Sequence, residues 1–259
     1  MHTPEFTRRG EPLVVFIHGF MGSPDQFSQL RDDSARLGAS TLTILLPGHG
    51  GTARDFVTHG VRDWERHLYN QLSQYSQGFE RVYLVGHSMG GLLSLLASAK
   101  PRHHIRGVML LSTPLRVNIF NPHANIFRLK LLRALVNAQI GRGDSTPLDD
   151  AAVLHVYETA LSVGKPRGLY GIAFLRPAFE FERLVIKARR NLAAVTVPCV
   201  LVHSRADETA HFSSADDLYR GLANAAKTRI VLDRSSHSYY DADEREIVKT
   251  ALKAMIAGA

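Results

Sequence analysis

A serine stands at the centre of the pentapeptide Gly-His-Ser-Met-Gly, which occupies residues 86–90. Residues 81–85 before it are mostly apolar, as in a strand, and residues 91–99 after it have the composition of a helix. A strand, a sharp turn and a helix in this order expose the side chain at the turn, and the glycines let neighbouring backbone approach closely. The free N–H groups at the helix start favour negative charge. The pattern therefore predicts that Ser88 is a nucleophile beside a site for a developing anion.

A serine hydroxyl needs a base within hydrogen-bond reach and an acid that orients this base. His237 lies in a polar loop after the last apolar run, and we select it as the base among 13 histidines. Asp207 follows the preceding apolar run and is the predicted acid. Its neighbour Glu208 is the rival, which we expect to face solvent. The chain order of Ser88, Asp207 and His237 is one known for nucleophile, acid and base.

The negative charge that forms on a substrate carbonyl needs two hydrogen-bond donors. The backbone N–H of Met89, next to the nucleophile, is the first expected donor. The second is the backbone N–H of Phe20, in a loop that directly follows the apolar run 13–17. The ring of Phe20 is also suited to line a pocket for an apolar group. A second loop, Pro47–Thr52, lacks the lysine of a phosphate-binding loop, and we interpret it as a structural turn near the site.

The elements that position these residues alternate along the chain. Alternating strands and helices indicate a mainly parallel sheet flanked by helices, with right-handed crossovers. The predicted strands span residues 13–17, 40–46, 82–85, 107–111, 197–203 and 228–232, and the predicted helices span residues 24–37, 61–75, 91–99, 214–223 and 243–257.

The alternation stops between residues 115 and 194, where the pattern is helical. Three helices are expected there, at residues 127–136, 149–163 and 179–190. A segment inserted after a parallel strand lies above the carboxyl ends of the strands, where α/β active sites occur. We therefore predict a core domain of residues 1–114 and 195–259 and a helical cap of residues 115–194.

Composition indicates an ordinary globular protein, since 45% of the 259 residues are hydrophobic and 21% are charged. The single cysteine, Cys199, excludes a disulfide framework and is expected to be a buried strand residue. No run of about 18 apolar residues is present, so no membrane insertion is expected. Together with the lack of a signal-peptide pattern, this predicts a cytoplasmic protein.

The formal net charge is +7, and most of the excess lies in the predicted cap. Residues 115–190 hold twelve Lys or Arg against six Asp or Glu, a net charge of +6. A basic patch is compatible with nucleic acid, an anionic membrane surface or an acidic substrate. We favour a solvated basic face and no nucleic-acid partner, because no nucleic-acid motif accompanies the charge.

The chain resembles the α/β-hydrolase superfamily, and within it the small bacterial carboxylesterases and monoacylglycerol lipases. This resemblance implies the α/β-hydrolase fold, a mainly parallel sheet flanked by helices with an inserted helical cap. The likeness covers nearly the whole chain outside the cap and rests on His18-Gly19-Phe20, Leu46-Pro47-Gly48-His49-Gly50, Asp63-Trp64, the pentapeptide 86–90, Asp207-Glu208, and Ser236-His237 before an acidic helix start at residues 241–244.

The resemblance also implies a triad of Ser88, Asp207 and His237, and an oxyanion hole formed by Phe20 and Met89. The implied activity is hydrolysis of carboxylic esters through an acyl-enzyme, with no cofactor and no metal. The expected partner is a small-molecule ester with an apolar acyl chain. The cap is longer and more basic than is usual in the family, so acyl length, alcohol preference and oligomeric state stay open.

Other activities fit the same residues. A thioesterase or a C–C bond hydrolase would use the same triad, and a perhydrolase or haloperoxidase-like enzyme is a further alternative. A haloalkane dehalogenase is disfavoured, because it needs an aspartate where Ser88 stands. A hydrolase-like binding protein that keeps the pocket without catalysis is the alternative outside enzymes.

Overall fold

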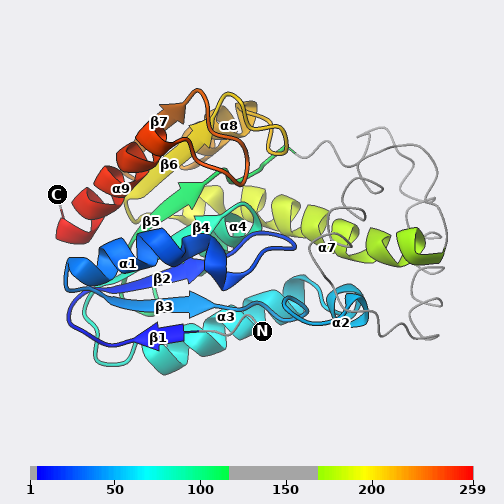
Figure 1. Cartoon of the computed structure of the whole chain (residues 1–259), viewed down its shortest axis with the longest axis horizontal. Helices are drawn as coiled ribbons and strands as arrows, with labels where there is room; N and C mark the ends of the chain where they lie inside the picture. Colours follow the sequence, from blue (N-terminus) through cyan, green and yellow to red (C-terminus); the bar gives the residue numbers. More distant parts are fainter. Residues whose placement is uncertain (1–4, 117–168, 259) are drawn as a thin grey trace.

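The computed structural model describes residues 5–116 and 169–258 of the chain (Figure 1). Its strands are β1 (Glu5–Thr7), β2 (Leu13–Ile17), β3 (Ser40–Ile44), β4 (Val82–His87), β5 (Ile105–Leu111), β6 (Cys199–Ser204) and β7 (Lys227–Leu232). Its helices are η1 (Pro24–Phe27), α1 (Ser28–Arg36), α2 (Ala53–Thr58), α3 (Val61–Tyr75), α4 (Met89–Ser98), α7 (Leu169–Asn191), η2 (Leu192–Ala194), α8 (Ser213–Gly221) and α9 (Ala242–Ala257).

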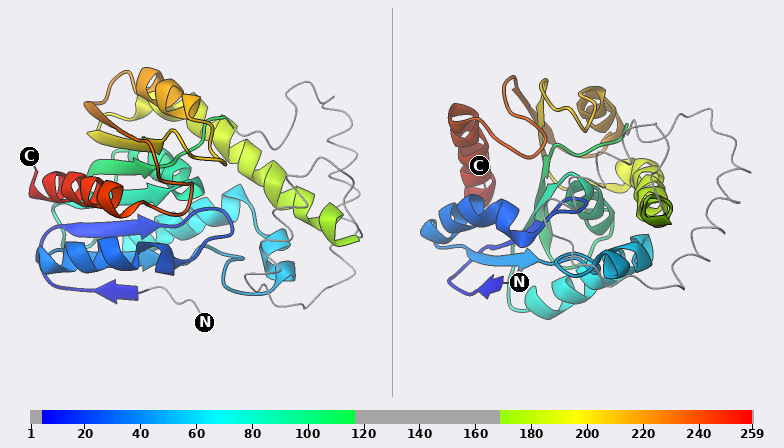
Figure 2. Two further views of the ribbon diagram at one scale, coloured as in Figure 1. Left: turned by 45° about the horizontal axis from the view of Figure 1, so that its top comes forward. Right: turned by 45° about the vertical axis from the view of Figure 1, so that its right-hand side comes forward.

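The strands form one sheet in the order β1-β3-β2-β4-β5-β6-β7. Strand β1 is antiparallel to β3, and every other neighbouring pair is parallel. Helices cover both faces of this sheet (Figure 2). The prediction of a mainly parallel sheet flanked by helices is therefore confirmed.

Strand β2 shows why the central strands are apolar throughout. Leu13, Val15 and Ile17 belong to one buried cluster, and Val14 and Phe16 belong to another on the opposite face. Successive side chains of a strand point to opposite faces, so a strand covered on both faces is a continuous apolar run. Helices α3, α4, α7 and α8 contribute to the first cluster, and helices α1 and α9 contribute to the second.

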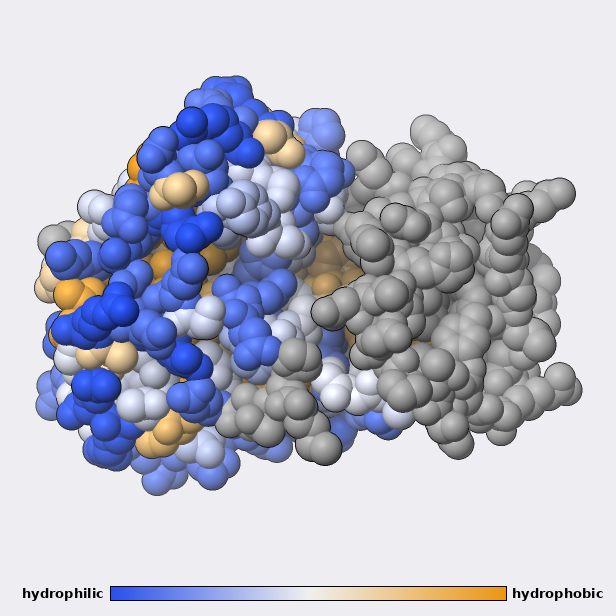
Figure 3. Space-filling model, in the orientation of Figure 1, coloured by the Kyte–Doolittle hydropathy of each residue, from blue (hydrophilic) through white to orange (hydrophobic). Residues whose placement is uncertain are grey.

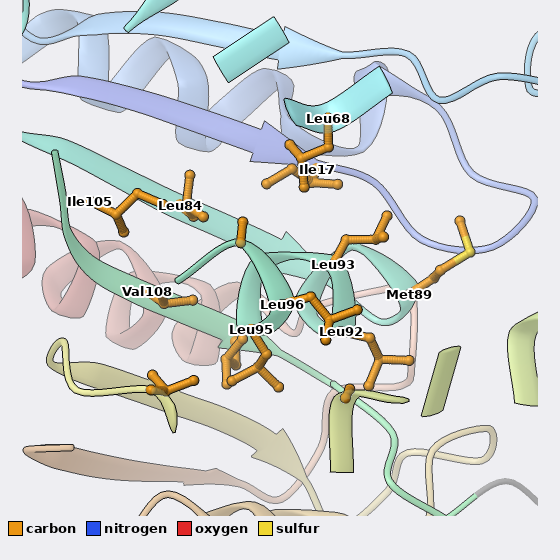
Figure 4. Packing of buried hydrophobic residues seen from close by; sticks show 14 of the residues in the cluster. Ile17, Leu68, Leu84, Met89, Leu92, Leu93, Leu95, Leu96, Ile105 and Val108 are labelled. Carbon is orange, nitrogen blue, oxygen red and sulfur yellow. The ribbon is translucent and has the colours of Figure 1, made fainter. Parts of the chain in front are cut away.

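Helix α4 lies at the centre of the first cluster, and all of its residues are buried. Its leucines gather with sheet residues such as Ile17 and Val108 (Figure 4). The helix starts unusually close to the sheet. A β-carbon added to Gly90 would lie 1.9 Å from the carbonyl oxygen of Ile17, and one added to Gly91 would lie 1.8 Å from Thr113 Oγ1. Gly90 therefore sets how near the helix comes to strand β2, and Gly91 sets how near it comes to the segment after β5.

Several elements differ from the sequence prediction. Residues 51–60 were expected to be a loop but contain α2, whose start is stabilised by a capping box between Thr52 and Asp55. The predicted helix 24–37 is divided into η1 and α1. Strand β1 was not predicted, because three residues at a sheet edge carry too short a pattern.

Helix α7 contains the predicted helix 179–190 but begins earlier and includes Pro177. A proline inside a helical pattern usually marks an end, which is why the prediction was too short. The second half of α7 packs into the core through Phe181, Leu184 and Ala188. The predicted cap helices 127–136 and 149–163 lie outside the described residues, so the division into core and cap stays a prediction.

Where Figure 3 is coloured, this face of the molecule is mainly hydrophilic, with apolar residues showing in small groups between polar ones. Among residues 5–116 and 169–258, no helix combines the length and apolarity needed to cross a bilayer. The same residues hold no group of three or more potential ligands arranged for a metal ion. Cys199 is buried in β6, as predicted, and burial raises the pKa of its thiol to about 12.

Replacing Gly90 by alanine should strongly destabilise the fold. The new methyl group would meet backbone that cannot move aside, so the free energy of unfolding should fall by about 3 kcal/mol. Gly221→Ala is the control, because the three atoms nearest its β-carbon all belong to the side chain of Leu192, which can shift more easily than backbone, and the change should cost less, about 1 kcal/mol. Urea denaturation measures both, and equal effects would contradict the proposed close packing of α4.

Candidate active site

The candidate residues lie where parallel strands end. Ser88 directly follows β4, Asp207 follows β6, His237 follows β7, and Phe20 follows β2. The carboxyl ends of parallel strands meet at one edge of the sheet, so these residues share that edge. Asp207 and His237 are in direct contact, with Nδ1 of His237 at 2.9 Å and 3.0 Å from the two carboxylate oxygens.

Ser88 occupies a strained turn between β4 and α4. Its φ of 50° and ψ of −115° lie in a region of backbone conformation that residues other than glycine rarely adopt. Its N–H donates to the carbonyl of Leu111 at 2.8 Å, which ties the turn to strand β5. A β-carbon on Gly86 would lie 2.4 Å from the carbonyl oxygen of Gly90. Strain held by such packing is typical of functional positions.

Asp207 is held as a carboxylate. Its side chain is fully buried, and burial alone would raise the pKa of the carboxyl group. Hydrogen bonds from His237 and from the backbone N–H groups of Ala210 and Thr209 outweigh this, so the pKa lies below its ordinary value. Because Asp207 accepts from Nδ1–H of His237, the Nε2 atom of that imidazole is left available for proton transfer.

The backbone of His237 is fixed on both sides. Its carbonyl accepts from Nε2–H of His87 at 2.8 Å, and its N–H donates to the carboxylate of Glu208 at 3.1 Å. Burial lowers the pKa of His87 to about 3, so this imidazole is neutral. The rings of His87 and His237 have centroids 4.9 Å apart, which puts the predicted base beside the residue that precedes Ser88.

The hydroxyl of Ser88 makes no hydrogen bond to the His237 ring in the part of the chain that the structure describes. Catalytic hydrogen bonds are often long without substrate and tighten in the complex. The structure thus joins the predicted acid and base directly and brings the predicted nucleophile next to them through its neighbour His87.

Glu244 at the start of α9 holds the loop that leads to His237. Its carboxylate accepts from the backbone N–H groups of Asp233, Arg234 and Ser235 at 2.7, 3.0 and 2.8 Å, and also from the Ser235 hydroxyl. Burial opposes the charge, but these donors lower the pKa of Glu244 to about 2. A single carboxylate therefore organises the backbone between β7 and the predicted base.

The predicted oxyanion donors have free N–H groups. Among the described residues, the N–H groups of Phe20 and Met89 donate to no carbonyl and no side chain. The loop of Phe20 runs against the nucleophile, since a β-carbon on Gly19 would lie 3.2 Å from Cβ of Ser88 and 2.9 Å from Nδ1 of His87. Two unused donors next to a serine are what a tetrahedral oxyanion requires.

The ring of Phe20 lies in an aromatic group. Its centroid is 5.0 Å from that of Phe56, 6.4 Å from that of Trp64 and 5.3 Å from that of Phe181. Phe181 belongs to α7, so the loop of Phe20 also contacts this helix. The ring is partly buried, and its expected place at the wall of an apolar pocket stays a prediction.

Sequence reasoning missed three supporting contacts. Glu208 is exposed, as expected, but its carboxylate also binds the N–H of His237. The hydrogen bond from His87 and the role of Glu244 were not predicted either. The acidic helix start at residues 241–244 was the available signal for Glu244, although it did not show which carboxylate turns toward the loop.

Glu244→Gln should destabilise the protein near neutral pH, because one amide cannot accept from four donors. The free energy of unfolding should fall by about 2 kcal/mol at pH 7. The lowered pKa of Glu244 stabilises the fold above its ordinary value of 4.5, and this contribution is lost as pH falls toward about 2. The difference between wild type and variant in urea denaturation should therefore shrink below pH 4.5.

Glu246→Gln is the control for this prediction. Glu246 is exposed on the same helix and pairs only with Lys249 in the described part of the chain, so its loss should cost under about 0.5 kcal/mol. A Glu244→Gln deficit that stays constant from pH 7 to pH 3 would contradict the assignment.

The chain is similar in sequence to a known lipase and, over a shorter stretch, to a synthase. The chain is 23% identical over 253 residues to a thermostable monoacylglycerol lipase of Bacillus sp. strain H-257, covering 96% of the chain and 92% of the relative. A shorter match, 31% identical over 101 residues, joins 39% of the chain to 38% of the 2-succinyl-6-hydroxy-2,4-cyclohexadiene-1-carboxylate synthase of Klebsiella pneumoniae.

Among solved structures, one from a study of two metagenome-derived lipolytic enzymes, LipS and LipT, superposes with a TM-score of 0.74. It is 19% identical and covers 100% of this chain and 98% of its own, which shows the shared fold. The family described as serine aminopeptidase, S33, matches residues 9–244. The parallel sheet and the strained turn at Ser88 agree with this family match, which covers most of the chain. The chain therefore belongs to this family of α/β hydrolases.

Proposed function

We propose that this chain is a serine hydrolase that cleaves carboxylic esters through an acyl-enzyme. Ser88 is the nucleophile, His237 the general base and acid, and Asp207 the group that orients His237. The backbone N–H groups of Phe20 and Met89 form the oxyanion hole. The observation that carries the proposal is the contact of the His237 imidazole with a buried carboxylate, beside a serine on a strained turn.

The reaction follows from these positions. Nε2 of His237 takes the proton of the Ser88 hydroxyl while Oγ attacks the ester carbonyl, and the oxyanion binds the two free N–H groups. The imidazolium, stabilised by Asp207, protonates the departing alcohol. A water molecule then loses a proton to His237 and attacks the acyl group, which releases the acid and restores Ser88.

The substrate class is supported by relatives and by the aromatic surroundings of Phe20. A monoacylglycerol lipase matches nearly the full length of the chain, and aromatic side chains next to the oxyanion loop suit an apolar acyl group. We further propose that residues 115–194 act as a cap over the site. The contact of Phe181 in α7 with Phe20 supports a link between this segment and the acyl pocket.

The local match to a synthase favours a second candidate, in which the same triad serves a substrate other than a carboxylic ester. Thioester hydrolysis and C–C bond cleavage are the reactions expected for this second candidate. A panel of p-nitrophenyl esters from acetate to palmitate, with monoacylglycerols and acyl-CoA, separates the candidates by their kcat/KM values. The ester proposal requires kcat/KM to be higher for the esters than for the thioesters.

Ser88→Ala should abolish ester turnover without lowering the melting temperature. Loss of the nucleophile from such a triad costs about a millionfold in kcat in a well-studied protease. Ser98→Ala is the control and should keep its activity, because Ser98 is a buried serine of the same helix whose hydroxyl, among residues 5–116 and 169–258, donates only to the Leu95 carbonyl. Both are assayed with p-nitrophenyl butyrate and with a fluorophosphonate label, and residual labelling of Ser88→Ala would refute the assignment.

Asp207→Ala should lower kcat by about 10⁴-fold, because the base loses its orienting carboxylate. Glu208→Ala should lower kcat by about tenfold or less, because water can replace an exposed acceptor of the His237 N–H. Steady-state kinetics on the same ester compare the two variants. The opposite ranking would assign the acid to Glu208.

A further inference from the structure

Two histidines join the oxyanion loop, residues 18–22, to the proline turn, residues 46–50. Nε2 of His18 accepts from the backbone N–H of Leu46 at 3.0 Å. In the other direction, Nε2 of His49 accepts from the backbone N–H of Met21 at 3.2 Å. Their rings contact each other, with centroids 4.7 Å apart. Each segment thus contributes one imidazole to the backbone of the other.

The second nitrogen of each imidazole fixes its protonation. Nδ1 of His18 lies 2.9 Å from the carbonyl of Gly19, and Nδ1 of His49 lies 3.2 Å from the carbonyl of Pro47. A carbonyl oxygen only accepts, so both Nδ1 atoms carry the proton and both Nε2 atoms are acceptors. Burial keeps His49 neutral by lowering its pKa to about 4.

These contacts determine where the N–H of Phe20 points. The carbonyl of Gly19 accepts from Nδ1–H of His18 and from the N–H of Gly22 at 3.1 Å. The Gly19–Phe20 peptide is trans and planar, so its N–H points away from its carbonyl. The next peptide is held through the Met21 N–H by His49, at a residue whose φ is 58°. The peptides on both sides of the Phe20 α-carbon are therefore fixed.

We propose that His49 is a positioning residue for the reaction, acting through the Met21 N–H to keep the Phe20 N–H directed at the oxyanion. This role of His49 rests on the proposed function, because it requires an oxyanion to form next to Ser88. His49 itself needs no contact with substrate. The Pro47–Thr52 segment, which sequence alone presents as a structural turn, thereby becomes part of the machinery that stabilises the transition state.

The test compares His49→Phe with His49→Gln. Phenylalanine keeps a ring against Phe56 and Trp64 but accepts no hydrogen bond, whereas the glutamine side-chain oxygen reaches the place of Nε2. Loss of oxyanion alignment should lower kcat of His49→Phe roughly tenfold to a hundredfold, with KM within about twofold of wild type. His49→Gln should recover to within about threefold of wild-type kcat.

A second readout separates alignment from general damage. The sulfur of a thionoester is a weak acceptor, so thionoester turnover gains little from oxyanion donors. His49→Phe should therefore lose far more turnover on an ester than on the matching thionoester. His104→Phe, an exposed histidine at the opposite end of the sheet, is the control and should change neither rate.

The outcomes are distinct. Wild-type kcat in His49→Phe, equal losses on ester and thionoester, or a His49→Gln variant no better than His49→Phe would each overturn the role of His49. If His49→Phe does not fold, His49→Asn replaces it, because its shorter side chain reaches the Pro47 carbonyl but not the Met21 N–H.

The rate of labelling by a fluorophosphonate compares the same His49 variants with the wild type without an ester substrate. A wild-type chain that is labelled but hydrolyses no ester would overturn the ester proposal alone, and the labelling rates of the variants would still judge His49. A wild-type chain that is neither labelled nor active would overturn both proposals.

Discussion

Gly90 leaves no room for a β-carbon between helix α4 and strand β2, since that atom would fall 1.9 Å from the Ile17 carbonyl oxygen. This close approach has consequences for the nucleophile turn and for the loop that faces it. It brings the first N–H of α4, that of Met89, to the carboxyl edge of the sheet beside the loop of Phe20. Ser88 lies directly before this helix with a positive φ, and the hydrogen bond from its N–H to the Leu111 carbonyl stabilises that turn.

The sheet was predictable because its strands are buried on both faces. Residues 13–17 form a strand with the predicted bounds, and helix 61–75 also has the predicted bounds, because its apolar positions recur at helical spacing. Elements stabilised by local polar contacts or by edge pairing were missed. Helix α2 depends on the Thr52–Asp55 capping box, and β1 depends on pairing with β3, neither of which produces an apolar period.

The site was predictable to the extent that its residues follow strands. Asp207 and His237 were selected because each follows an apolar run, and the structure joins them at 2.9 Å. The hydrogen bonds that support these two residues were not visible in the sequence, because most of them are made by backbone groups. The bond from His87 to the His237 carbonyl and the four donors around Glu244 depend on loop paths that residue types do not specify.

The only thiol of the chain is sequestered inside strand β6, where its high pKa keeps it protonated and unreactive. A disulfide between two molecules through Cys199 therefore requires this part of the sheet to open first. A cysteine introduced at any exposed position would be a unique attachment point for a spectroscopic probe.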